Sequence, residues 1–162
     1  MRTTRRATPR AFTLIEAVVV IVLLAIIVPP SVAWLCRAGA ERVDAVNATR
    51  ASFLAGTVLE HVLADAASDA SGLGAGAFAS PSAYLSTPTT GLYARLATAV
   101  QPYTAMGFTY GVDIGAAVDE TGAVNANTAL NVFHVVTVTV TYPSSTQSSA
   151  PSLSISTIVG SL

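Results

Sequence analysis

The chain has 162 residues, of which 52% are hydrophobic and only 10% are charged, which is unusually little charge for a soluble domain. This length allows one membrane segment and one small domain. There is no lysine, and four of the eight arginines lie within the first ten residues. The remainder therefore carries four arginines against nine acidic residues, a balance that argues against nucleic-acid binding.

A short basic tail, residues 1–11, precedes the apolar part of the chain. Its four arginines predict a cytoplasmic N-terminus by the positive-inside rule. Three further arginines, Arg37, Arg42 and Arg50, lie on the other flank of the apolar segment and weaken that prediction. The charge balance by itself therefore leaves the orientation open.

An apolar run follows from Phe12 to Val28, interrupted by a single charge, and it continues through Pro29 and Pro30 to Cys36. The 20 residues from Ala17 to Cys36 would form about 30 Å of helix, which is enough to span a bilayer. The two prolines lack backbone donors, so we expect them to kink or loosen the helix.

The single charge in this run is Glu16. An acidic group at a bilayer centre costs about 2.5–3.5 kcal/mol, so a glutamate kept in such a segment is a functional hypothesis and needs a cationic partner. The nearest candidate is an amine created by cutting the chain just before Phe12.

The segment Ala11–Glu16, with the long aliphatic helix after it, resembles the class III signal of type IV pilins and type II secretion pseudopilins. The resemblance covers roughly residues 10–40. It implies that a prepilin peptidase cuts between Ala11 and Phe12 and methylates the new amine of Phe12. It also implies that Glu16, the fifth mature residue, serves assembly. The family usually has Gly before the cut, whereas Ala11 stands here.

The same resemblance implies the partners and the location. They are prepilin peptidase, other pilin or pseudopilin subunits, an inner-membrane assembly platform and membrane lipid. The protein would be a single-pass inner-membrane protein with its N-terminus cytoplasmic before processing. Its globular part would be periplasmic or otherwise extracytoplasmic.

Two alternative interpretations of the N-terminal segment remain open. Thr13 and Glu16 have the spacing of a capping box, in which Glu16 only stabilises a helix start. Alternatively, residues 1–33 could be a secretory signal peptide with a weak cleavage site at Ser31-Val32-Ala33. The apolar run exceeds the usual h-region of about 7–15 residues, which argues against the second interpretation.

Residues 40–69 have the pattern of an amphipathic helix, so the N-terminal half is expected to be one long, kinked helix of about 55 residues. We expect its apolar stripe to pack on a globular domain and to comprise Val43, Val46, Phe53, Leu54, Val58 and Val62. The glycines of residues 71–76 should end the helix. Cys36, the only cysteine, excludes an internal disulfide, and we expect it to be packed.

The second half of the chain changes to strand periodicity. Residues 77–90 are expected to be a connecting loop, with Tyr84 and Leu85 as contacts, and Leu92–Val100 a short helix closed by Pro102. Strands are predicted at Phe108–Ile114, Val132–Tyr142 and Leu153–Val159. The fold class is therefore α+β, a long N-terminal helix packed on a small antiparallel β-meander.

The expected organisation has four parts. These are a leader peptide (1–11), a transmembrane or filament-core helix (12–36), an amphipathic helix (37–70), and the loop and sheet of a globular domain (71–162).

No catalytic, cofactor or metal site is predicted. His61 lies near Glu60 and Asp65 at helical spacing, and these side chains could hold a cation, but a solvated helix face is the simpler interpretation. We interpret His134 as a packed or edge histidine of a strand. The acidic residues Asp113, Asp119 and Glu120 flank a turn without the spaced ligands of a calcium loop.

The favoured function is a non-enzymatic, pilin-like structural subunit of a type II secretion pseudopilus or type IV pilus-like filament. The alternative is an unprocessed single-pass membrane protein whose small outer domain binds a ligand or senses the envelope.

Overall fold

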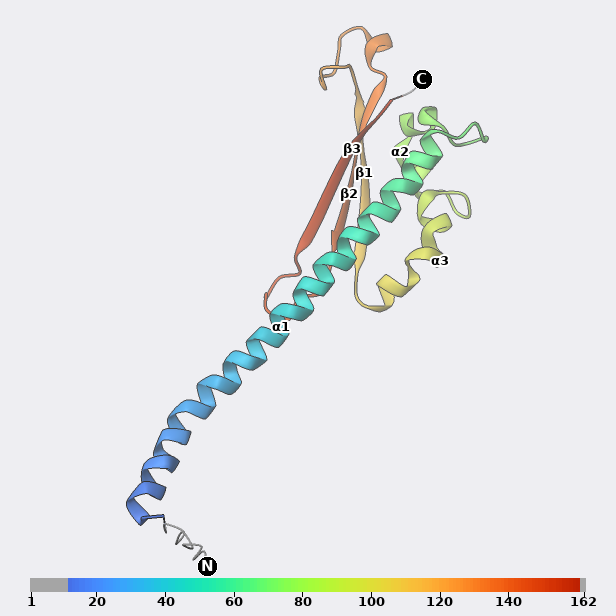
Figure 1. The fold of residues 1–162 in the computed structure, drawn as a ribbon. Coiled ribbons are helices and arrows are strands. Elements are labelled where there is room, and N and C mark those ends of the chain that lie inside the picture. Colours follow the sequence, from blue (N-terminus) through green and yellow to red (C-terminus); the bar gives the residue numbers. More distant parts are fainter. Residues whose placement is uncertain (1–11, 161–162) are drawn as a thin grey trace, which may run out of the picture. The chain divides into compact units, whose positions relative to one another are not determined.

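The computed structural model describes residues 12–160, and these divide between two compact units, Met1–Ala40 and Glu41–Leu162. Ala11 and the rest of the predicted leader lie outside the described residues. Figure 1 shows the order of the elements along the chain. They are α1 (Leu14–Ala66), η1 (Ala75–Ala79), α2 (Pro81–Ser86), α3 (Leu92–Ala105), β1 (Thr109–Val118), η2 (Thr128–Leu130), β2 (Phe133–Thr141) and β3 (Ser152–Gly160).

The long helix α1 contains 53 residues, close to the predicted length. Thr13 caps it, because the Thr13 hydroxyl accepts the backbone N–H of Glu16 at 3.3 Å. The helix runs through Pro29 and Pro30 without interruption, so the two missing donors leave it intact. Just beyond them, the Ser31 hydroxyl donates to the carbonyl of Ile27 at 2.8 Å.

The buried stripe of α1 lies within the second unit and differs from the predicted stripe. Leu54, Val58 and Val62 are buried as expected, but Val43, Val46 and Phe53 are exposed. Consecutive helical residues are about 100° apart, so burying Leu54 turns its neighbour Phe53 away from the core. The buried positions of α1, at spacings of three and four, are Asn47, Ala51, Leu54, Ala55, Val58, Val62 and Asp65.

Two boundaries between the helix and the sheet also differ from the prediction. The expected loop over residues 77–90 contains η1 and α2, with Tyr84 buried. The helix α3 continues through Pro102 to Ala105. A proline has a helix-compatible φ and removes only one backbone donor, so one further turn is tolerated near a helix end.

The three strands form an antiparallel sheet in the order β1-β2-β3, which confirms the predicted meander (Figure 1). The strand β2 is central, and its alternation is clean. Val136, Val138 and Val140 are fully buried on one face, while its threonines are partly exposed on the other. These valines pack in one core with Leu54 and Val58 of α1 and with Leu92 and Leu96 of α3. The α+β architecture is therefore confirmed.

Candidate functional site

The apolar run lies in the first unit and is covered by nothing within the described chain. Every residue from Phe12 to Arg37 is exposed. The most apolar 18-residue window of α1 has a mean hydropathy of 2.7 and no buried residue, so α1 is long and apolar enough to cross a membrane. Water is a poor solvent for such a surface, which is typical of a segment that contacts lipid or other apolar helices.

The residues predicted to carry processing and assembly lie at the start of this run. Phe12 is 72% exposed and precedes the first helical residue, Leu14, by two positions. Glu16 lies in the first helical turn, where the helix dipole favours a negative charge. Ala11 lies outside the described residues. Among residues 12–160, no side chain pairs with the Glu16 carboxylate. The structure therefore shows Glu16 at a capped helix start, without the expected cationic partner.

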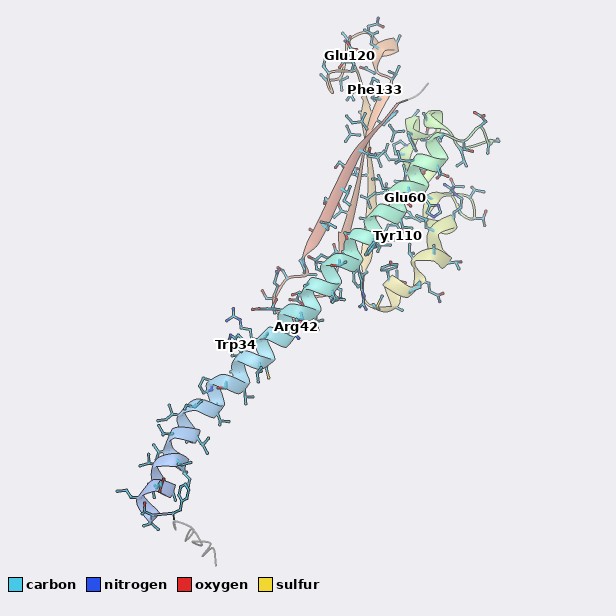
Figure 2. The ribbon with its side chains drawn as sticks, in the orientation of Figure 1. Trp34, Arg42, Glu60, Tyr110, Glu120 and Phe133 are labelled. Carbon is cyan, nitrogen blue, oxygen red and sulfur yellow. The ribbon has the colours of Figure 1, made fainter. Side chains whose placement is uncertain are left out.

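The far end of the run carries Trp34 and Cys36. Trp34 is exposed (Figure 2). Cys36 is also exposed, so the expectation that it is packed is wrong for the single chain. The reason is that no segment of the described chain covers this part of α1.

In the second unit, an ion pair joins a buried carboxylate, Asp65, to a partly exposed guanidinium, Arg95. The guanidinium of Arg95 donates two hydrogen bonds of 2.6 Å to the Asp65 carboxylate, and the Tyr84 hydroxyl donates a third of 2.6 Å. Asp65 is only 7% exposed. Burial raises the pKa of Asp65, but the bonds from Arg95 and Tyr84 outweigh it and lower the pKa below its usual value. Burial and the adjacent Asp65 carboxylate raise the pKa of Tyr84.

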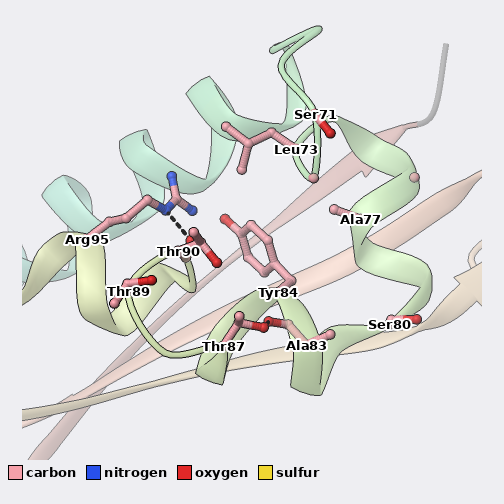
Figure 3. A pocket seen from close by; sticks show the side chains of 12 residues that line it. Ser71, Leu73, Ala77, Ser80, Ala83, Tyr84, Thr87, Thr89, Thr90 and Arg95 are labelled. Carbon is pink, nitrogen blue, oxygen red and sulfur yellow. Dashed lines mark hydrogen bonds between the residues drawn. The ribbon is translucent and has the colours of Figure 1, made fainter.

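This ion pair borders a surface pocket of about 760 Å³, shown in Figure 3. The polar groups of Arg95 are already used, because its Nε also donates to the Thr90 carbonyl at 2.9 Å. The Thr87 hydroxyl donates to the Ala83 carbonyl. The charge of Arg95 at this pocket is therefore balanced by Asp65, and its hydrogen-bond donors are occupied. This arrangement stabilises the fold and leaves no free reactive group on these residues.

A second polar cluster fixes the β2–β3 loop to α1. The Asp44 carboxylate accepts hydrogen bonds from the backbone or side chains of Ser144, Ser145 and Thr146. The Asn47 amide donates to the Pro143 carbonyl at 3.0 Å. These bonds, led by the one from the Thr146 hydroxyl, hold the pKa of Asp44 far below its usual range.

The candidate cation ligands are not brought together. Asp65 is engaged by Arg95, while Glu60 and His61 are exposed on α1. The Asp119 carboxylate is bonded within its own turn, and the bonds from Thr121 and Asn125 lower its pKa to about 2. Among residues 12–160 there is no group of three His, Cys, Asp or Glu side chains suited to a metal ion.

His134 takes the packed role that the sequence suggested. It is almost fully buried on β2, and its Nδ1 lies 3.0 Å from the carbonyl oxygen of Gly115.

Sequence reasoning missed both polar clusters of the second unit. The usable signal was the helical spacing, because Asp65 follows Val58 and Val62 in the stripe, and Asn47 precedes Ala51 in it. A charged residue in a buried stripe requires a partner. The partners are far away in sequence, however, because Arg95 lies 30 positions after Asp65 and Pro143 lies 96 positions after Asn47, so no local pattern identifies them.

The fold defines a class, a pilin-like α+β organisation in which a long helix packs on a three-stranded antiparallel sheet, and the first part of that helix is long and apolar enough to cross a membrane. Residues 6–28 match the family described as the prokaryotic N-terminal methylation motif. The chain therefore carries a prepilin-type signal, typical of type IV pilins and pseudopilins, and such a signal implies processing by prepilin peptidase. Comparison with curated proteins and with solved structures finds no match.

Proposed function

We propose that this protein is a structural subunit that prepilin peptidase cuts between Ala11 and Phe12 and methylates at Phe12. The mature chain then assembles into a type II secretion pseudopilus or a type IV pilus-like filament. The observation that carries the proposal is the wholly exposed apolar run from Phe12 to Cys36, whose only charge, Glu16, lies in the first turn of α1 within the matched motif. The four-part organisation, with boundaries after residues 11, 36 and 70, belongs to this proposal.

Glu16 has a specific part in the proposed assembly. Cleavage turns the backbone nitrogen of Phe12 into a cationic amine close to the Glu16 carboxylate in sequence. In a filament, Glu16 of one subunit pairs with that amine of a neighbouring subunit, as the resemblance implies. The pairing supplies the cation that residues 12–160 of a single chain do not offer.

The proposed location is the inner membrane, with the N-terminus cytoplasmic before processing and the second unit outside the cytoplasm. The inner-membrane assembly platform and lipid are the corresponding partners. An unprocessed single-pass sensor is the weaker candidate. A ligand in the pocket beside Arg95 would find few free polar groups there, because Arg95 and Tyr84 already bond to Asp65 and Thr90.

The decisive measurement is the N-terminus of the protein from membranes of cells that contain prepilin peptidase. We expect mass spectrometry to find methylated Phe12 as the first residue. Ala11→Gly should be cut at least as well as the wild type, because the position needs a small side chain. Ala11→Leu should accumulate as precursor. Efficient cutting of Ala11→Leu, or a mature chain that begins elsewhere, would refute the proposed site.

A further inference from the structure

The two edges of the sheet differ in how well they are protected. On the β1 edge, the backbone N–H of Val112 donates to the Tyr93 hydroxyl at 3.2 Å. The register of β1 shifts between Ile114 and Ala117, and Asp113 adds an exposed charge. Both η1 and α2 lie against this strand. A bulge, a charge and covering elements are the usual devices that keep a strand edge from pairing with another chain.

The β3 edge has none of these devices. Its nine residues pair with β2 in an unbroken register from Ser152 to Gly160. They include no charged residue and no proline. Within residues 12–160, no strand lies on the other side of β3. A long, regular and uncharged edge of this kind is a template for a further strand.

The register identifies the backbone groups that this edge presents. The Tyr142 N–H donates to the Pro151 carbonyl at 3.0 Å, so these two residues form a hydrogen-bonded pair. Hydrogen-bonded and non-hydrogen-bonded pairs alternate along an antiparallel ladder, so every second residue of β3 turns its N–H and C=O groups away from β2. By the same alternation, the backbone N–H of Val112 in β1 points away from β2, and it donates to the Tyr93 hydroxyl. The assignment is therefore consistent at both edges of the sheet. The residues whose N–H and C=O groups turn outward from β3 are Ser152, Ser154, Ser156 and Ile158.

The side chains of β3 define what a pairing strand should carry. On the core face, Leu153 and Ile155 are only half-buried, whereas the β2 valines beside them are fully buried. On the other face, the Ser154 and Ser156 hydroxyls lie 2.9 Å from those of Thr139 and Thr137 of β2. On the edge that pairs with β2, β3 therefore lies beside valine on the core face and beside threonine on the opposite face.

We propose that the outer edge of β3 binds an extended, uncharged segment of another protein by β-strand addition. Main-chain hydrogen bonds to Ser152, Ser154, Ser156 and Ile158 hold the segment. Its apolar side chains cover Leu153 and Ile155, and its hydroxyl side chains continue the Ser/Thr face. Strand addition of this kind takes its affinity from the main chain and its specificity from alternate side chains.

A second copy of this chain is the less suitable occupant. Because the β1 edge is protected, a second copy can pair only through its own β3. Two β3 edges that pair in one continuous sheet are related by a two-fold axis perpendicular to the plane of that sheet. That axis reverses every direction in the plane of the sheet. The Glu41 ends of the two α1 helices, from which each chain continues into its apolar run, would then point in opposite directions, which does not suit two chains that the proposed function anchors in one membrane.

The test uses the full chain in detergent and a fluorescent peptide that copies residues 132–142, with two lysines added at each end for solubility. This peptide carries the alternation that β3 already accepts from β2. We expect saturable binding by fluorescence anisotropy. A peptide with the same side chains, but with alternate backbone nitrogens methylated on its pairing edge, should not bind, because its main-chain donors are blocked.

The matched variants are Ser154→Pro and Ser148→Pro. The first removes an outward N–H that the folded chain does not use, and places a ring on the edge, so binding should weaken about tenfold or more. The second places the same residue in the β2–β3 loop and should leave binding unchanged. Circular dichroism melting of both variants shows whether the fold is kept.

Three results would overturn the proposal. The methylated peptide could bind as well as the unmodified one, or a folded Ser154→Pro could bind it unchanged. Alternatively, sedimentation could show that the protein itself dimerises in a way that Ser154→Pro abolishes, which would assign the edge to a second copy. The methylated-peptide comparison decides the proposal even if Ser154→Pro does not fold. All these measurements use unassembled protein, so they are independent of the proposed processing and filament function.

Discussion

The two halves of α1 share one helix but meet different environments. From Leu14 to Arg37 the helix is almost entirely apolar and every residue is exposed, whereas from Glu41 to Ala66 it buries one stripe against a sheet. In the first half, a single carboxylate, Glu16, interrupts the apolar surface. In the second half, the carboxylates of Asp44 and Asp65 are each held by several donors from the same chain.

The comparison sets a structural role, which the bonds of Asp65 show, against the assembly role that we propose for Glu16. Asp65 finds Arg95 and Tyr84 within its own chain, so its charge stabilises the fold. Glu16 has no such partner among residues 12–160, and the proposed function assigns its charge to a neighbouring subunit. The four predictions that follow test this difference, from the largest expected effect to the smallest.

Deleting residues 1–39 should separate the two environments completely. The deletion removes the exposed apolar run and leaves the second unit, which has its own core. We expect a soluble monomer that unfolds cooperatively and shows mixed helix and strand by circular dichroism. A fragment that aggregates or melts without a transition would mean that the second unit requires the first for folding.

Replacing Glu16 by valine should abolish assembly but leave processing intact. The more apolar helix should insert at least as readily, so we expect the proposed cut before Phe12 to be kept. Removing one partner from a buried ion pair costs about 3–5 kcal/mol, because the neighbour's amine is left unpaired. We therefore expect at least a hundredfold loss of subunits in sheared filaments or in membrane crosslinks.

The control for that experiment is Glu60→Val, which removes an exposed carboxylate from the other half of α1. It should assemble normally. Equal assembly of Glu16→Val and wild type would show that Glu16 only starts a helix.

Within the second half, Leu54→Ala and Phe53→Ala should differ sharply although the residues are adjacent. Leu54 is 1% exposed and Phe53 is 66% exposed. We expect Leu54→Ala to lower the free energy of unfolding by about 2–5 kcal/mol and Phe53→Ala to change it by less than about 0.5 kcal/mol. Chemical denaturation of the fragment that lacks residues 1–39 measures both. The opposite ranking would show that the helix packs on its other face.

The Asp65 ion pair should make stability depend on pH in the acid range. Its folded pKa is lowered, so its contribution is present above the unfolded value of about 3.9 and is lost as the pH falls through the lower folded value. Asp65→Asn should lower the melting temperature at pH 7 and flatten its fall between pH 5 and 2. Asp69→Asn, an exposed control, should leave the profile unchanged. A wild-type profile that stays flat down to pH 2 would contradict the assigned role of Asp65.

Local patterns in the sequence predicted much of this protein because they depend on neighbouring residues. The 20-residue apolar stretch required a long helix, and the alternation of valine and threonine over residues 132–142 required a half-buried strand. The segment Ala11–Glu16 indicated the prepilin-type signal, because its chemistry lies in consecutive residues. Thr13 was likewise recognisable as a cap from its spacing to Glu16.

Only the tertiary structure decided which face of α1 is buried and which polar residues pair. Phe53 and Leu54 are both apolar and adjacent, and the sequence pattern placed both in one predicted stripe. The position of the sheet determines that Leu54 is buried and Phe53 is exposed. The partners Asp65–Arg95 and Asp44–Ser144 are separated by many residues, so their pairing depends on how the chain folds back. The same holds for the edges of the sheet. Strand composition predicts three strands, but strand order and the position of Tyr93 protect β1 and leave β3 open.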